Sequence, residues 1–222
     1  MVSNEQEHAA GITAAKAALA DKRCIVLPTD TVYGIGADAF SAQGVAMLLA
    51  AKGRGRTMPP PVLIAQTATM DGLARDIPDA ARKLAEAFWP GGLTLILQAQ
   101  PSLTWDLGET RGTVGLRVPN DETALELLRE TGPLAVSSAN RTGQPAALDA
   151  DSAMEQLGES VDVYLDGGSR GENSTDALPS TIIDCTGEHL KVVRSGAISI
   201  EELRVVVPEV LDLGQDAPGQ RA

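Results

Sequence analysis

Three cationic side chains alternate through a loop that is rich in glycine and proline, KGRGRTMPPP at residues 52–61. Lys52, Arg54 and Arg56 are each separated by one residue, and alternate residues of an extended chain project to the same side. Arginine binds phosphate oxygens bidentately, whereas lysine acts as a compact point charge. The chain as a whole is acidic, with a net charge of −12, so this local cluster predicts a polyphosphate site. An ordinary solvated basic loop is the alternative.

A second candidate segment, VSSANRTGQPA at residues 136–146, joins a short apolar run to a polar turn. Ser137, Ser138 and Asn140 offer small hydroxyl and amide groups at the expected carboxyl end of a strand. Such groups, together with exposed backbone N–H groups, suit contacts with phosphate or ribose. The segment lacks the G-x-S-x-G pattern of a serine hydrolase elbow. The residues therefore favour ligand binding over nucleophilic catalysis, with an ordinary turn as the alternative.

Buried polar side chains are expected in the apolar strands as well. TVGLRVP, residues 113–119, alternates so that Thr113, Gly115 and Arg117 share one face. An arginine on the inner face of a strand needs a partner or a ligand. Ser180 and Arg194 follow in two later strand-like segments, PSTIID and VVRSG. The chain has no G-x-x-x-x-G-K-[ST] motif and no metal-ligand spacing, which disfavours a P-loop NTPase and a dedicated metal centre.

The stretch LPTDTVYGIGADAF, residues 27–40, contains the pattern G-x-G-x-x-A at Gly34, Gly36 and Ala39. A dinucleotide-binding turn needs a helix that opens within the glycines and an acidic residue roughly 20 positions later. Here the predicted helix begins only after Ser41, and the residues downstream are basic. The stretch is expected to be a loop, either a plain glycine turn or part of a substrate pocket of another kind.

These candidate residues need elements to position them, and helical and strand patterns interleave along the whole chain. Helices are expected at residues 5–21, 42–51 behind a Ser41 cap, 67–75, 78–88, 121–130, 149–157 and after a Ser199–Glu202 capping box. Strands are expected at residues 23–27, 62–65, 93–98, 113–118, 134–137, 161–165, 181–185 and 189–194, the last two forming a hairpin, with loops at 28–40 and 166–179. The pattern predicts one α/β domain over residues 5–208, with a twisted mixed parallel and antiparallel sheet and flanking helices. Residues 209–222 are expected to form a flexible tail.

Composition narrows the functional classes. Hydrophobic residues make up 43% of the chain, which is enough to form a core without disulfides. The two cysteines, Cys24 and Cys185, lie in apolar runs and are expected to be buried thiols, which fits a reducing cytoplasm. The sequence shows no signal-peptide pattern and no apolar run long enough to span a membrane. The charge of −12 argues against a protein that grips nucleic acid through its phosphates.

Seven motifs occur together in one order over residues 8–200: PTDTVYG, Lys52-x-Arg54, FWPGGLT, TVGLRVP, Ser138-x-Asn140, STIID and VRSG. Together they resemble the YrdC-type family of threonylcarbamoyl-adenylate synthases, and the length resembles its single-domain form. The resemblance implies a twisted sheet with a concave ligand-binding face. It also implies a reaction in which L-threonine, bicarbonate and ATP give threonylcarbamoyl-AMP and pyrophosphate. The product would be passed to a tRNA threonylcarbamoyl-transferase, and Mg²⁺ would accompany the ATP.

The resemblance also assigns roles to individual residues. Lys52 and Arg54 would hold the phosphates and carry catalysis. The remaining ATP contacts would come from Thr113, Ser138, Asn140 and Arg194. Threonine would be held by Thr31, Arg117, Ser180 and the backbone near Val136, with Tyr33 as a wall of the pocket.

The chain departs from the family pattern at two places. Leu63 aligns with a position where many members carry a histidine that touches threonine, which puts the amino-acid affinity or selectivity in question. A basic residue that the family often has near Met58 is missing, and Arg56 is a hypothetical substitute. Two other functions are consistent with the same fold, namely a non-catalytic nucleotide- or RNA-binding protein and carbamoyl-adenylate chemistry on another acceptor.

Overall fold

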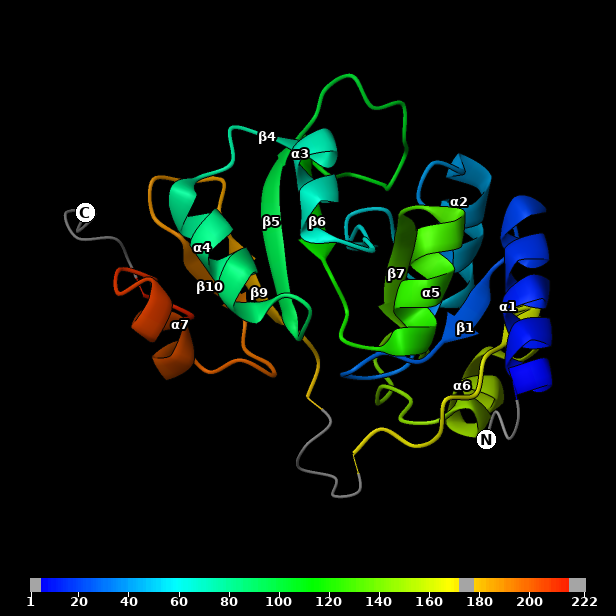
Figure 1. Cartoon of the computed structure of the whole chain (residues 1–222). Helices are drawn as coiled ribbons and strands as arrows, with labels where there is room; N and C mark the ends of the chain where they lie inside the picture. Colours follow the sequence, from blue (N-terminus) through cyan, green and yellow to red (C-terminus); the bar gives the residue numbers. More distant parts are fainter. Residues whose placement is uncertain (1–4, 172–177, 216–222) are drawn as a thin grey trace.

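The sheet runs across the whole molecule in a computed structural model that describes residues 5–171 and 178–215 (Figure 1). Its strands follow the spatial order β10-β9-β5-β6-β3-β7-β2-β1-β8, with β4 beside β5. The strands are β1 Ile25–Leu27, β2 Gly34–Asp38, β3 Val62–Leu63, β4 Ala74–Arg75, β5 Leu93–Ala99, β6 Thr113–Arg117, β7 Leu134–Ser138, β8 Val163–Tyr164, β9 Thr181–Asp184 and β10 Lys191–Arg194. Strand pairs β3–β6, β5–β9 and β1–β8 are parallel and the others are antiparallel, so the predicted mixed sheet is confirmed.

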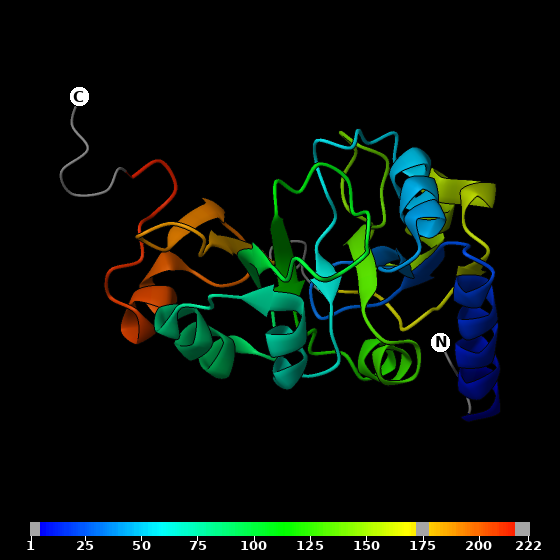
Figure 2. The same ribbon diagram turned by 90° about the horizontal axis from the view of Figure 1, so that it is seen from above.

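Helices cover both faces of the sheet. The view from above shows α3, α4 and α5 on one face, with α2 and α6 on the other (Figure 2). The helices are α1 Glu5–Ala20, α2 Ala42–Ala51, α3 Met70–Leu73, α4 Asp79–Phe88, α5 Glu122–Thr131, α6 Ala150–Leu157 and α7 Ile200–Val206, with single 3-10 turns at Thr67–Thr69 and Gly158–Ser160. Two predicted caps are confirmed: Ser41 accepts a hydrogen bond from the Gly44 N–H, and Ser199 forms a capping box with Glu202.

Alternate strand residues face the two helical layers, as the period of a strand requires. Ile25 and Leu27 of β1 belong to a buried cluster with α1 and α5. Val26 of β1 and Ile35 of β2 belong to the other cluster, which includes the buried leucines of α2. Both cysteines are buried and free, and burial raises the pKa of each thiol.

Strand β3 joins the two halves of the sheet. It is two residues long and pairs with β6 on one side and β7 on the other. Val62 lies opposite Leu116 and Ala135, while Leu63 lies opposite Arg117 and Leu134. The three prolines before it end any regular structure, as the sequence predicts.

The expectation that residues 28–40 form one loop is wrong. Gly34–Asp38 is a strand, β2, which pairs antiparallel with both β1 and β7. Four of its five residues are glycine, alanine or aspartate, which have low β-propensity. Its strand conformation therefore comes from pairing on both edges. The predicted helix start after Ser41 is confirmed, which removes the dinucleotide-binding turn as an interpretation.

Two other boundaries also differ from expectation. Residues 67–75 are not one helix but a 3-10 turn, the short helix α3 and strand β4. The predicted flexible tail begins too early at 209, because Val210 is buried and Leu211 bridges to Lys191 of β10. Residues 216–222 of that tail, and 172–177 of the predicted loop 166–179, lie outside the described residues.

Gly34 allows β2 to approach β7 closely. A Cβ at Gly34 would lie 2.5 Å from Val136 Cγ1, whereas at Gly36 it would lie 3.2 Å from Leu27 Cδ2. We expect Gly34→Ala to lower the free energy of unfolding by about 1–3 kcal/mol, because the added methyl overpacks a buried contact. Gly36→Ala is the matched control and should cost less, as measured by urea denaturation of both variants. Equal losses in the two variants would contradict this account.

Candidate active site

A cavity of about 320 Å³ opens between the two halves of the sheet. Its walls come from segments that are far apart in the sequence: the loop before β2, the basic loop after α2, the ends of β6 and β7, the start of β9 and the end of β10. The residues that line it include Thr31, Tyr33, Arg54, Leu63, Thr94, Arg117, Val136, Ser137, Ser138, Asn140, Gln144, Pro179, Ser180 and Arg194. The fold therefore brings together most of the residues that the sequence singled out.

Three arginines from three different elements line this cavity. Arg54 donates from Nη1 to Ser137 Oγ at 2.9 Å, and its buried Nε finds no partner among the described residues. Burial lowers the pKa of Arg54 and of Arg194, and the charges of Arg117 and Arg54 lower the pKa of Arg194 further. Since like charges repel in a partly buried site, this arrangement favours an anionic ligand.

Arg194 is held against the start of β9. Its guanidinium donates from Nε and Nη2 to the Ser180 carbonyl oxygen at 3.0 and 2.7 Å, and from Nη2 to Ser180 Oγ at 2.9 Å. Ser180 Oγ also lies 2.8 Å from Thr94 Oγ1. The glycine of the VRSG motif makes this packing possible, because a Cβ at Gly196 would lie 2.1 Å from the Pro179 carbonyl oxygen.

Lys52 lies behind the cavity wall rather than in it. Its side chain is buried, and the ammonium donates to the carbonyl oxygens of Ser138 and Asn140 and to Asn140 Oδ1 at 3.3 Å. In return, the Lys52 carbonyl oxygen accepts from the Thr142 N–H at 2.9 Å. Burial, and then the nearby charge of Arg54, lower the pKa of Lys52 to about 8. Lys52 therefore fastens the loop that follows β7.

The expectation that Lys52, Arg54 and Arg56 project to one side is wrong. The segment is not extended, because Lys52 is the C-cap of α2 and Gly53 has a positive φ of 60°. The turn sends Lys52 into the interior and Arg54 to the cavity. Arg56 is exposed instead, and its Nη2 forms an ion pair with Asp106 Oδ1 at 2.7 Å.

The loop before β2 is tied down at two points. Thr31 Oγ1 accepts from Arg117 Nη1 at 3.0 Å and lies 3.1 Å from Thr29 Oγ1. The Tyr33 hydroxyl donates to the Gly168 carbonyl oxygen at 2.7 Å and accepts from the Gly167 N–H at 2.9 Å. Burial raises the pKa of Tyr33 to about 12, so this phenol stays neutral.

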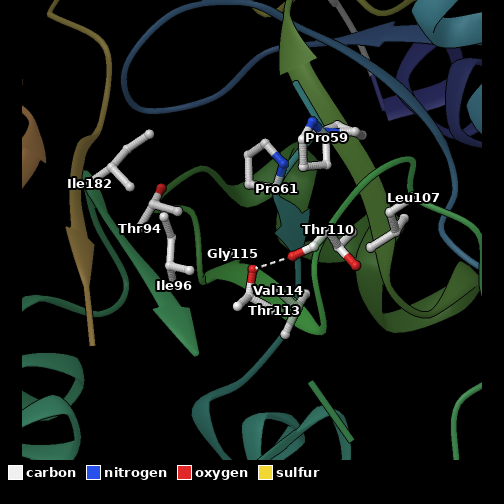
Figure 3. Close-up of a pocket in the computed structure, with 11 residues that line it drawn as sticks. Pro59, Pro61, Thr94, Ile96, Leu107, Thr110, Thr113, Val114, Gly115 and Ile182 are labelled. Atoms are coloured by element: carbon white, nitrogen blue, oxygen red, sulfur yellow. Dashed lines mark hydrogen bonds between the residues drawn. The ribbon is translucent and has the colours of Figure 1, made fainter. Parts of the chain in front are cut away.

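A second, smaller cavity of about 100 Å³ adjoins the first and shares Pro59, Pro61, Thr94 and Ile182 with it (Figure 3). Its lining is largely apolar, with prolines of the basic loop facing Ile96, Leu107 and Val114. Thr113 lines this cavity and not the larger one, and its hydroxyl donates to the Thr110 carbonyl oxygen at 2.8 Å. The two cavities together offer a cationic end and an apolar end.

Asp30 is a residue of the site that sequence reasoning missed. Its Oδ1 forms an ion pair with Arg117 Nη2 at 2.6 Å, and both side chains are largely buried. Two features of the sequence could have indicated Asp30. It lies beside Thr31 in the PTDT stretch, and a buried arginine such as Arg117 needs a partner. Gln144 and Pro179 of the cavity wall carried no signal in the sequence.

Two further properties concern the described residues only. None of their helices combines the length and apolar character that a membrane crossing requires. In the same part of the chain, no cluster of three or more His, Cys, Asp or Glu side chains is arranged to hold a metal ion.

Comparison with known proteins gives consistent matches. Residues 17–196 match the Sua5/YciO/YrdC family model, which is described as "Telomere recombination". A Mycobacterium leprae protein provisionally named threonylcarbamoyl-AMP synthase is 51% identical over 205 residues, covering 92% of this chain and 91% of the relative. The Bacillus subtilis threonylcarbamoyl-AMP synthase is 34% identical over 88% of this chain and 56% of its own.

Comparison with solved structures gives matches of the same kind. Pyrococcus abyssi Sua5 complexed with L-threonine superposes with a TM-score of 0.86 at 30% identity, covering 96% of this chain. The chain spans 62% of that longer protein. Escherichia coli YciO, at 24% identity and a TM-score of 0.76, supports the fold alone.

Proposed function

The chain belongs to the Sua5/YciO/YrdC family, and on that premise we propose that it is a threonylcarbamoyl-AMP synthase. The substrates are L-threonine and ATP, with bicarbonate as the carbon source. The observation that carries the proposal is that the larger cavity is lined by three arginines, of which Arg54 and Arg194 have no carboxylate partner among the described residues and Arg117 contacts Thr31. One end of this cavity suits a polyphosphate and the other suits an amino acid.

ATP occupies the cationic and apolar ends together. Arg54 and Arg194 face the phosphates, because neither has a carboxylate partner among the described residues. Ser138 and Asn140, held by Lys52, shape the same wall. The adjoining apolar cavity at Thr113 suits the adenosine end of the nucleotide.

Threonine binds at the other end. Arg117 is positioned against its carboxylate, with Thr31, Ser180 and the backbone at Val136 around it. Leu63 lines this part of the cavity as well. An apolar side chain at this point offers no hydrogen bond to the threonine hydroxyl, so Thr31 and Ser180 remain as hydroxyl partners for it.

The reaction needs positioning and charge more than a protein nucleophile. The threonine amine combines with bicarbonate to give a carbamate and water. A carbamate oxygen then attacks the α-phosphorus of ATP, the bond to the β-phosphate oxygen breaks, and pyrophosphate leaves. Both reactants are anionic, so the arginines lower the barrier by neutralising the charge that develops on the phosphoryl oxygens.

Mg²⁺ is expected to accompany ATP and to neutralise part of its charge. Asp30, the carboxylate that contacts a cavity arginine, already accepts from Arg117 and Asn120. The ion would therefore be held by phosphate oxygens and water. We further propose that the product is handed to a tRNA threonylcarbamoyl-transferase in the cytoplasm, and that the acidic chain does not itself bind tRNA.

Pyrophosphate release tests the proposed function. The protein is incubated with ATP, Mg²⁺ and bicarbonate, and with each amino acid in turn. We expect release that depends on L-threonine and on bicarbonate, with L-serine as the matched control that lacks one methyl group. If folded protein gives no threonine-dependent release, the proposed function is wrong. Retained ATP binding would then indicate the non-catalytic nucleotide-binding function.

A further inference from the structure

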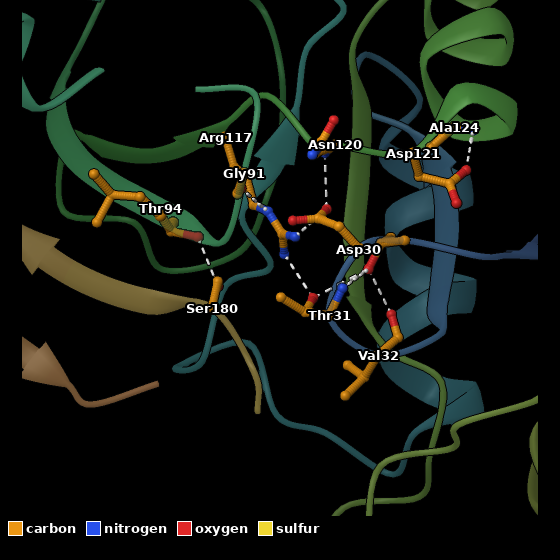
Figure 4. A network of polar contacts seen from close by, with 12 residues as sticks. Asp30, Thr31, Val32, Gly91, Thr94, Arg117, Asn120, Asp121, Ala124 and Ser180 are labelled. Carbon is orange, nitrogen blue, oxygen red and sulfur yellow. Dashed lines mark hydrogen bonds and ion pairs between the residues drawn. The ribbon is translucent and has the colours of Figure 1, made fainter. Parts of the chain in front are cut away.

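Asp30 lies between two elements of the site and is bonded to both. Its Oδ1 accepts from Arg117 Nη2 at 2.6 Å and from the Asn120 N–H at 2.9 Å (Figure 4). The Arg117 side chain is 7% exposed and that of Asp30 is 15% exposed, so water screens this ion pair little. The contact joins the loop before β2 to the turn between β6 and α5.

Asp30 is absent from the cavity lining, whereas Arg117 and Thr31 are part of it. The Asp30 carboxylate therefore contacts the Arg117 guanidinium on the side that faces away from the cavity. Arg117 has five N–H groups, and the protein uses three of them: Nε with the Gly91 carbonyl oxygen, Nη1 with Thr31 and Nη2 with Asp30. The described residues leave one N–H free on each terminal nitrogen, which suits a carboxylate.

Charge compensation separates Arg117 from the other two cavity arginines. Arg54 bonds to a serine hydroxyl and Arg194 bonds to Ser180, so neither is neutralised by a carboxylate among the described residues. Arg117 is neutralised by Asp30. A triphosphate is attracted most strongly to charges that lack compensation, whereas a zwitterionic amino acid has no net charge and binds through fixed hydrogen-bond geometry.

We propose that Asp30 is a positioning residue that assigns Arg117 to the amino acid. It fixes the guanidinium plane and cancels its charge, so that the carboxylate of threonine binds there and the phosphates bind Arg54 and Arg194. This inference rests on the proposed function, because it concerns the substrate ends of the same cavity.

Two variants test this role. Asp30→Asn keeps a hydrogen-bond acceptor of the same size and removes the charge, whereas Asp30→Ala removes both. We expect Asp30→Ala to raise the dissociation constant for L-threonine by roughly 10²-fold, since a buried charged partner is lost, with a change of less than about threefold for ATP. Asp30→Asn should raise it by only about tenfold. Isothermal titration calorimetry with L-threonine and with ATP gives both values without relying on turnover.

A second readout separates charge cancellation from mere structural support. In the Asp30→Asn variant, inorganic tripolyphosphate should compete with L-threonine, because Arg117 is no longer neutralised, whereas in the wild type it should compete with ATP alone. Asp121→Asn is the matched control: Asp121 forms a similar ion pair with Arg170 nearby, and its amide variant still caps α5. That control should bind both substrates as the wild type does.

The outcomes are distinguishable from failure of the proposed function. If the wild type neither binds L-threonine nor releases pyrophosphate, the proposed function fails first. If the wild type binds L-threonine and Asp30→Asn matches it in affinity and in tripolyphosphate competition, the role of Asp30 is refuted. Equal losses of threonine and ATP affinity would also refute it, since they indicate a general structural role. Should Asp30→Ala fail to fold, as judged by circular dichroism, Asp30→Asn decides alone.

Discussion

Replacing Arg54 with alanine should lower the turnover number for threonine-dependent pyrophosphate release by on the order of 10²–10³. Arg54 lies in the cavity wall, and its Nε has no partner among the described residues. Burial lowers the pKa of Arg54 because it destabilises the charged guanidinium. A bound anion would offset this destabilisation. The group that most needs such a charge is the phosphoryl group as pyrophosphate leaves.

Two further variants make the Arg54 experiment specific. Arg54→Lys keeps the charge but loses the planar fork, so it should recover only part of the rate. Arg56→Ala is the matched control from the same loop, and it should behave as the wild type because Arg56 is exposed and pairs with Asp106. A large loss in Arg56→Ala would instead show that Arg56 takes part in ATP binding. Wild-type turnover in Arg54→Ala would refute the role of Arg54.

Removing the Lys52 ammonium should lower kcat/KM for ATP by roughly 10²-fold. In Lys52→Ala the carbonyl oxygens of Ser138 and Asn140 lose their shared donor, and unpaired buried acceptors cost stability and position. The end of β7 and the loop after it, which carry Ser138 and Asn140 to the cavity, then lose their fixed geometry. Steady-state kinetics with ATP as the varied substrate measure this loss, and an unchanged kcat/KM would contradict it.

The same lysine predicts a pH dependence. Because the pKa of Lys52 is lowered to about 8, kcat/KM should fall as the pH rises above that value and the ammonium loses a proton. Lys52→Ala should lack this fall.

The variant also separates the Lys52 proton from unfolding. Between pH 8 and 10.5 the unfolded chain binds more protons at Lys52 than the folded protein does, so the contribution of Lys52 to the free energy of unfolding rises over this range. The buried thiols and Tyr33, whose pKa values are raised, make the opposite contribution, and Lys52→Ala shares it with the wild type. We therefore expect the difference in free energy of unfolding, wild type minus Lys52→Ala, to rise with pH while the wild-type activity falls, and a falling difference would refute this interpretation.

The fold was largely predictable because most of its elements carry a period of their own. Helix α5 and strand β6 have alternations that the sequence shows plainly, and the Ser41 and Ser199 caps locate two helix starts. Strand β2 was not predictable, since glycine and alanine carry no apolar alternation and its pairing depends on strands that are distant in the sequence. The bridge between Leu211 and Lys191 of β10 also depends on tertiary contacts, so the sequence pattern does not show it.

The site was predictable in its membership but not in its geometry. Arg117 could be recognised as a buried arginine that needs a partner, and the structure identifies that partner as Asp30. The positions of Lys52 and Arg54 could not be derived from alternation, because a positive φ at Gly53 turns the chain between them. A sequence pattern lists the groups that meet at a site, whereas backbone turns decide which of them reach the ligand.

The shortness of β3 has a mechanical consequence. Within the sheet, strands β6 and β7 are joined through the two residues of β3, so the two halves of the sheet share a narrow seam, which the bonds of Arg117 to Thr31 and Asp30 also cross. Arg117 and Arg194 belong to one side of that seam, and Ser138 belongs to the other. A ligand that contacts Ser138 together with Arg117 or Arg194 would bridge the two sides of the seam. We expect the substrates to hold the two halves of the sheet together in this way.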